Sequence, residues 1–176
     1  MKITKEWEGL KQKDNGIYVI DGNLISEEGI EIDLDNDLIV AGNIIAKTGI
    51  SCREGIIATW GIKTDCDIDA GRFIEAGCDI EAGLDINAGE GIVAGRGIKA
   101  GCGIVAGHFI NAGEGIVAGS GIKAGSFIHS EKRIFAGISM YNTNEDCIKT
   151  IKCAELRKGE ICYGDLIINK REEEKK

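Results

Sequence analysis

The 176-residue sequence contains no proline, and only nine of its residues are aromatic. Proline cannot donate a hydrogen bond to a strand ladder, so its absence is compatible with uninterrupted β-sheets. The sequence also lacks a run of about eighteen apolar residues such as a membrane-spanning helix requires. Its first sixteen residues, MKITKEWEGLKQKDNG, have no apolar segment typical of a signal peptide. We therefore expect a cytoplasmic protein without a membrane partner.

Histidine is scarce, basic residues are in deficit, and cysteine follows no pairing pattern. The seven cysteines are odd in number and include no C-x-x-C pair, which predicts reduced thiols. With two histidines, the sequence suggests neither a metal site nor a cofactor site. The formal charge of -8 argues against direct nucleic-acid binding, because release of counterions requires a basic surface. An acidic surface instead favours a basic protein partner.

Glycine, by contrast, is abundant and strictly placed. From Ala70 to Ile128 the chain repeats A-G-x-x-I-x without an insertion, and such a fixed period predicts a solenoid. Isoleucine recurs at every sixth residue from Ile32 to Ile134, apart from Leu38, and a second column, mostly alanine, follows two residues later. Alternation places both columns on the same side of a short strand. We expect the glycine that follows to let the chain turn a corner.

The outward-facing charges favour three hexads per coil. An eighteen-residue coil stacks Lys63, Glu81 and Lys99, so that opposite charges meet. A twelve-residue coil would instead place Asp67 on Asp79. Such a like-charged pair costs about 1 kcal/mol at the spacing of neighbouring strands, even in water. The sequence therefore predicts an all-β fold, a triangular parallel β-helix (β-solenoid) of about six regular coils, with its handedness left open.

Four segments follow from where the hexad pattern begins and ends. We expect an N-terminal cap over residues 1–31, the hexapeptide-repeat solenoid over 32–138, C-terminal strands or a cap over 139–170, and a charged tail over 171–176. Caps are expected because a solenoid exposes an unpaired ladder at each end.

The hexad pattern resembles two known classes of solenoid. The hexapeptide-repeat acyltransferases share the six-residue period, but their small residue comes four positions after the aliphatic one, whereas here it comes two positions after. Their activity is therefore not carried over. The chain is also similar in architecture to the bactofilins, which are self-associating β-solenoids without catalytic residues. That resemblance covers residues 32–137 and implies self-association.

Two outward-facing groups of residues are candidate binding sites. The first is an acidic belt that wraps around the middle of the solenoid: Asp65, Asp67, Asp69, Glu75, Asp79, Glu81 and Asp85. The belt either keeps the protein soluble or binds a basic surface by imitating the charge of a nucleic-acid backbone. The second is an aromatic stripe of Phe73, Phe109 and Phe127, which an eighteen-residue coil places in one column. The stripe is expected either to form a homodimer contact or to pack beneath the C-terminal segment.

These features favour a non-enzymatic binding protein that presents a rigid acidic surface to a macromolecular partner. One specific version is an inhibitor of a nucleic-acid-binding complex, of the kind a phage or mobile element directs against host defences. The alternative is a self-associating structural solenoid of the bactofilin kind. An enzyme would require a cleft, and an uninterrupted repeat does not predict one.

Overall fold

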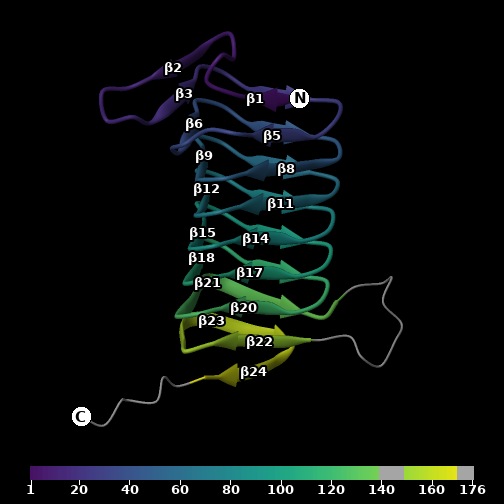
Figure 1. Ribbon diagram of the computed structural model, residues 1–176. Helices are drawn as coiled ribbons and strands as arrows, with labels where there is room; N and C mark the ends of the chain where they lie inside the picture. Colours follow the sequence, from purple (N-terminus) through teal and green to yellow (C-terminus); the bar gives the residue numbers. More distant parts are fainter. Residues whose placement is uncertain (139–148, 170–176) are drawn as a thin grey trace, which may run out of the picture.

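The chain folds as a parallel β-solenoid of about eight turns (Figure 1). We describe residues 1–138 and 149–169 of a computed structural model. Within these residues all regular structure is strand. The strands form three stacked faces, two of which are joined into one sheet by the long strand β21. The predicted fold class is confirmed.

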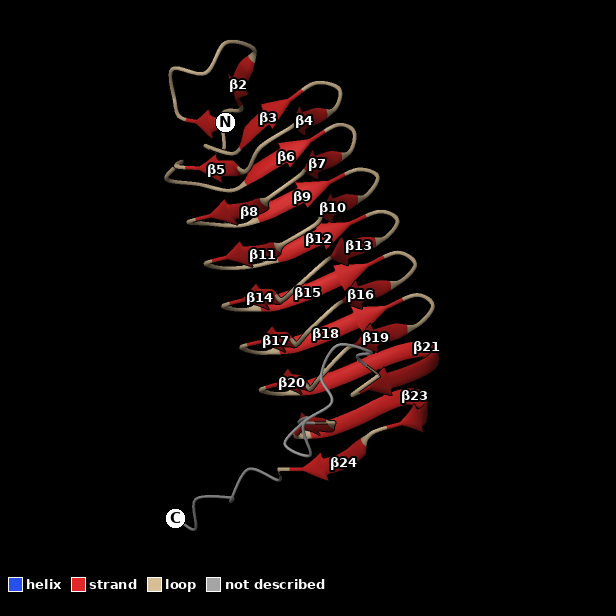
Figure 2. Ribbon diagram, turned by 90° about the vertical axis from the view of Figure 1, so that its right-hand side faces the viewer, coloured by secondary structure: helices blue, strands red, loops and turns tan. Residues whose placement is uncertain are grey.

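Each face takes one short strand from every coil, and Figure 2 shows the three stacks from the side. The first face contains β3 (Tyr18–Ile20), β6 (Leu38–Val40), β9 (Ile56–Ala58), β12 (Ile74–Ala76), β15 (Gly91–Ala94), β18 (Phe109–Ala112) and the first halves of β21 (Phe127–Ala136) and β23 (Glu155–Tyr163). The second contains β4 (Leu24–Ser26), β7 (Ile44–Ala46), β10 (Ile62–Thr64), β13 (Ile80–Ala82), β16 (Ile98–Ala100), β19 (Ile116–Ala118) and the second halves of β21 and β23. The third contains β1 (Lys2–Ile3), β5 (Ile30–Ile32), β8 (Gly49–Cys52), β11 (Asp67–Ala70), β14 (Ile86–Ala88), β17 (Ile104–Ala106), β20 (Ile122–Ala124), β22 (Thr150–Cys153) and β24 (Asp165–Ile168).

The pairing register confirms the eighteen-residue coil. Lys63 lies opposite Glu81, which in turn lies opposite Lys99, as the charge argument predicted. The isoleucine and alanine columns point inward and are buried along the whole rod. Each buried isoleucine contributes roughly 1.5 to 3 kcal/mol of gross hydrophobic stabilisation, so this column is the main source of stability.

The expectation that the hexad register begins at Ile32 is wrong. Ile30, not Ile32, pairs with the column residue Ile50, and Ile32 lies opposite Cys52 in the second column. The first coil therefore begins at β3, inside the segment expected to be a cap. The connection from β5 to β6 is two residues longer than the later ones, and it buries Leu34. This extra length shifted the apparent phase of the repeat.

The N-terminal end of the solenoid is closed. β1 pairs with β5, and Ile3 is fully buried. Trp7 and Leu10 pack against the core, while β2 (Leu10–Gln12) folds back antiparallel onto β3. The last strands, β22 to β24, continue the parallel stack. The rest of the expected C-terminal cap and the charged tail, residues 139–148 and 170–176, lie outside the described residues.

The corner glycines are required by close approach, not by an unusual backbone angle. None of the glycines in the A-G repeats from Ala70 to Ile128 has a positive φ. A Cβ on Gly83 would lie only 1.9 Å from the carbonyl oxygen of Asp65, in the same corner one coil earlier. A Cβ on Gly101 would likewise lie 1.9 Å from the carbonyl oxygen of Gly83. The expected reason for these glycines, freedom to turn, is therefore replaced by a steric one.

Candidate protein-binding surface

Three of the seven belt carboxylates are hydrogen-bonded to the backbone of the next coil. Each stands directly before a column isoleucine. The Asp67 Oδ1 accepts the N–H of Asp85 at 2.9 Å, and the Asp85 Oδ1 accepts the N–H of Gly103 at 2.6 Å. The Asp79 Oδ1 accepts the N–H of Gly97 at 3.0 Å. These side chains satisfy backbone donors that would otherwise lack a partner, which gives them a structural role.

The same bond recurs outside the belt. Asp37 accepts the N–H of Gly55 at 2.9 Å, and Asn43 accepts the N–H of Gly61 at 3.1 Å. The sequence signal for this hydrogen bond is an Asp or Asn immediately before a column residue. The residue eighteen positions later then supplies the backbone N–H that donates to it. The belt aspartates were predicted to act through their charge, and their hydrogen bonds to the backbone were not predicted.

The other four belt residues are distributed around the rod. Glu75 lies on the first face, Glu81 on the second and Asp69 on the third, and Asp65 follows β10 at the corner. Glu81 forms an ion pair with Lys63 at 2.9 Å, and Asp69 accepts a hydrogen bond from Asn87 at 2.9 Å. The belt is thus not one patch, and its role in binding stays a prediction.

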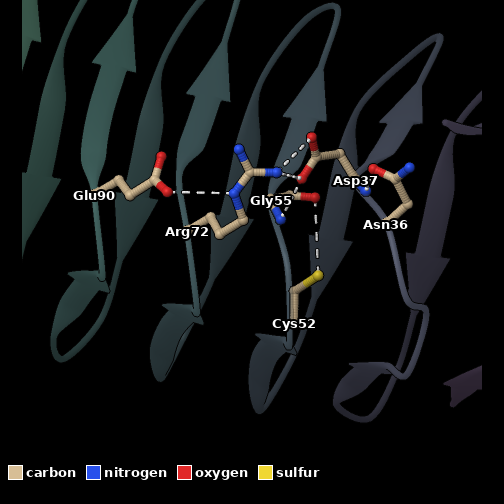
Figure 3. A network of polar contacts seen from close by, with 6 residues as sticks. All are labelled: Asn36, Asp37, Cys52, Gly55, Arg72 and Glu90. Atoms are coloured by element: carbon tan, nitrogen blue, oxygen red, sulfur yellow. Dashed lines mark hydrogen bonds and ion pairs between the residues drawn. The ribbon is translucent and has the colours of Figure 1, made fainter. Parts of the chain in front are cut away.

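An arginine clamp links four successive coils at the corner between the third and first faces (Figure 3). The Arg72 Nη1 donates to both carboxylate oxygens of Asp37, at 3.1 and 3.2 Å, and its Nε donates to Glu90 at 3.3 Å. Asp37 is nearly buried, so its charge needs these partners. The buried thiol of Cys52 lies beside this network, 3.8 Å from the Gly55 carbonyl oxygen, and burial raises its pKa to about 11. The cluster is built to hold coils together.

The aromatic stripe is half-buried and packs within its own face. The Phe109 ring lies over Gly91, where an added Cβ would come within 2.5 Å of the ring, and Phe73 covers a glycine one coil earlier in the same way. Phe109 and Phe127 stack with their ring centroids 5.3 Å apart. The guanidinium of Arg157, from the C-terminal strand β23, lies 3.5 Å from the Phe127 ring centroid. A homodimer contact through this stripe stays a prediction.

Three large apolar side chains, by contrast, are exposed near the N-terminal end of the second face. Trp60 is 59% exposed, Ile25 51% and Ile45 37%. Ile25 and Ile45 lie opposite each other on β4 and β7, and Ile45 and Trp60 line the same shallow groove of about 320 Å³. We call these three residues the corner patch. Sequence reasoning missed it, although in Leu24-Ile25 and Ile44-Ile45 only one residue of each pair can face inward.

The groove beside the corner patch has a charged rim. It is also lined by Lys63 and Glu81, which pair with each other, and by Asp79 and Arg96, whose side chains lie 3.0 Å apart. An apolar centre with a polar rim is the usual anatomy of a protein interface. The corner patch and its rim are therefore the best candidate binding surface on the rod.

Within the described residues, no group of three or more His, Cys, Asp or Glu side chains is placed to hold a metal ion. None of the described residues forms a helix long and apolar enough to cross a membrane.

Comparisons with known proteins return no relative. The chain matches no protein-family model, no curated protein and no solved structure.

Proposed function

We propose that the protein is a non-enzymatic binding protein whose corner patch docks a protein partner, one that carries an apolar segment beside lysine or arginine residues. The observation that carries this proposal is the exposure of Trp60, Ile25 and Ile45 together on one edge of the rod. Most other outward positions of the repeat carry charged, polar or glycine residues.

The residue types favour a binding role over a chance exposure. Tryptophan is among the residues that contribute most to interface energies, and truncating such an anchor commonly costs 2 kcal/mol or more. Ile45 projects from β7, which pairs with β4 on one side and β10 on the other, and Ile25 projects from β4, which pairs with β7. Trp60 lies in the connection between β9 and β10, where its N–H donates to the Gly42 carbonyl oxygen at 3.2 Å and its carbonyl oxygen accepts the Cys78 N–H at 2.7 Å. A partner would therefore meet a pre-organised surface, which reduces the entropy lost on binding.

The charges around the corner patch favour a basic partner. Glu75 lies opposite Ile57 on the first face, one coil beyond the apolar residues, and Glu81 lies on the groove rim. Asp65 is exposed at the following corner. Together with the formal charge of -8, these carboxylates favour a partner with a basic rim around its apolar segment. Proteins that bind nucleic acids provide such basic surfaces, so an inhibitor of a nucleic-acid-binding complex is a specific version of this proposal.

A peptide library displayed on phage and selected on the immobilised protein tests the proposal. We expect enriched peptides to combine aromatic or aliphatic residues with Lys or Arg, and to bind at least tenfold more weakly to Trp60→Ala. Leu84→Ala is the matched control, because Leu84 is also exposed and also stands two residues before a column isoleucine. It should change affinity less than twofold. Binding should also weaken as salt is added.

Two results would overturn the proposal. One is a selection that enriches no peptide above background. The other is a set of peptides that bind Trp60→Ala and the wild type equally well, or that lack basic residues.

A further inference from the structure

The two ends of the solenoid differ in how they are finished. At the N-terminal end, Ile3, Trp7 and Leu10 cover the first coil. At the other end, β24 pairs on one side with β22, and its residues are all exposed. A stack of parallel strands with one covered end and one uncovered end has a single site for further stacking.

The last coil presents core positions to its surroundings. Leu166 and Ile168 on β24 lie opposite Ile151 and Cys153, which are 0% and 1% exposed. Leu166 and Ile168 therefore occupy the inward columns, yet each is 41% exposed. In every earlier coil the next coil covers these columns. Here no described residue does so completely.

β23, which runs along the first and second faces of the last coil, repeats this arrangement. Leu156 and Ile161 on β23 lie opposite the column residues Ile128 and Ile134, and both are only partly buried. None of the four inward residues of this coil, Leu156, Ile161, Leu166 and Ile168, is charged. Inward-facing charge is a device by which natural sheets prevent edge pairing, and it is absent from these positions.

We propose that a second copy of the chain docks on this end, so that two rods join tail to tail through their last coils. A two-fold axis parallel to the plane of the last coil, half a strand spacing (~2.4 Å) beyond it, and perpendicular to β24 at its middle, maps the three-sided cross-section onto itself. It sets β24 antiparallel to its own copy and exchanges the two halves of β23. Antiparallel pairing is available to every open edge strand, and the four apolar residues of each copy meet those of the other.

The charges at this end are compatible with its own copy. β23 carries Glu155, Arg157, Lys158 and Glu160, so both signs are present within one strand. A surface with one sign would repel its copy, whereas mixed signs can pair across a two-fold axis.

A second copy of the chain supplies an apolar surface of the same outline as this end. The closed N-terminal end then limits the assembly to a dimer.

Light scattering coupled to size-exclusion chromatography tests the proposal over a range of concentrations. We expect the wild type to approach twice the 18.8 kDa mass of one chain. The double variant Leu166→Asp/Ile168→Asp should be a monomer. Ile167→Asp is the matched control: Ile167 lies between them on β24, is similarly exposed and pairs with the outward-facing Lys152. This variant should remain a dimer.

A second measurement does not depend on how the variants fold. Wild-type chains labelled with ¹⁴N and ¹⁵N are mixed and treated with a short amine cross-linker. Links between light and heavy chains should join Lys152 and Lys158, near the open end, and not Lys5 and Lys11, near the closed end. A wild type that stays monomeric at high micromolar concentration, an assembly that grows beyond a dimer, or mixed-isotope links confined to the N-terminal lysines would each overturn the proposal.

Discussion

Replacing one corner glycine by alanine should destabilise the solenoid far more than replacing a glycine within a strand. At Gly101 an added Cβ would lie 1.9 Å from the carbonyl oxygen of Gly83. A Cβ essentially never comes closer than 3.0 Å to another heavy atom, so the two corners would have to separate by about 3.0 − 1.9 = 1.1 Å. At Gly49, the nearest atom to an added Cβ is the Asp67 carbonyl oxygen at 3.5 Å, which is an ordinary contact.

The separation at Gly101 has a defined cost. Its N–H donates to the carbonyl oxygen of Ala82 at 3.0 Å, and the next N–H donates to Leu84 at 2.9 Å. Moving the corner by about 1 Å would stretch both bonds beyond hydrogen-bonding distance. Each lost bond costs about 1 kcal/mol, and overpacking adds about 1 to 3 kcal/mol. We therefore expect Gly101→Ala to lower the free energy of unfolding by about 3 kcal/mol.

We expect Gly49→Ala to raise the free energy of unfolding. Its backbone angle suits any residue, and alanine restricts the unfolded chain more than glycine does. This restriction stabilises a protein by about 0.4 to 1 kcal/mol where the native site has room. Urea unfolding followed by circular dichroism measures both variants, with the slope of the transition compared to verify that the same structure unfolds. Equal changes in the two variants would refute the steric account of the corner glycines.

Two further predictions concern the hydrogen bonds from aspartate side chains to the backbone of the next coil and the buried thiol of Cys52. Asp85→Ala should lower the free energy of unfolding by about 1 to 3 kcal/mol, because the Gly103 N–H loses its acceptor. Asp85→Asn keeps an acceptor oxygen, so in the same urea experiment it should cost less than half as much. Burial raises the pKa of Cys52 to about 11, so as the pH rises the unfolded chain releases this thiol proton before the folded chain does. The stability that the buried thiol contributes is therefore complete below about pH 9 and is lost towards pH 11. Urea midpoints measured from pH 8 to 11 should therefore fall more steeply for the wild type than for Cys52→Ala, and parallel pH profiles would contradict this.

The periodicity of the sequence was sufficient to predict the core and the coil length. Side chains that face inward in a solenoid meet the same kind of neighbour in every coil, so the isoleucine column appears directly as a period of six. The coil length followed from outward charges such as Lys63 and Glu81, because stacked residues lie close enough for like charges to be costly. The one error of phase, at Ile32, arose where a longer connection changes the coil length locally.

The candidate surfaces were harder to predict, because a repeat fixes which residues stack but not what their side chains bond. An eighteen-residue coil places Asp67 beside Asp85, and in the structure the Asp67 carboxylate accepts the backbone N–H of Asp85 instead of standing as a second surface charge next to it. The corner patch depends on whether anything covers Trp60, which is a property of the folded rod. The open end depends on the same kind of information, since Leu166 and Ile168 look like ordinary core residues in the sequence.

The two proposed surfaces lie at opposite ends of the rod, and this separation gives them a joint consequence. Trp60 precedes β10 in the third coil, five coils from the last one, which at about 4.8 Å per coil places it roughly 24 Å from the open end. Tail-to-tail docking would therefore hold two corner patches about 50 Å apart on one stiff body. A partner that itself presents two sites at this spacing would bind both patches, and its second binding event would be intramolecular. The rod needs no flexible linker to achieve this, so it loses little conformational entropy when the second site is occupied.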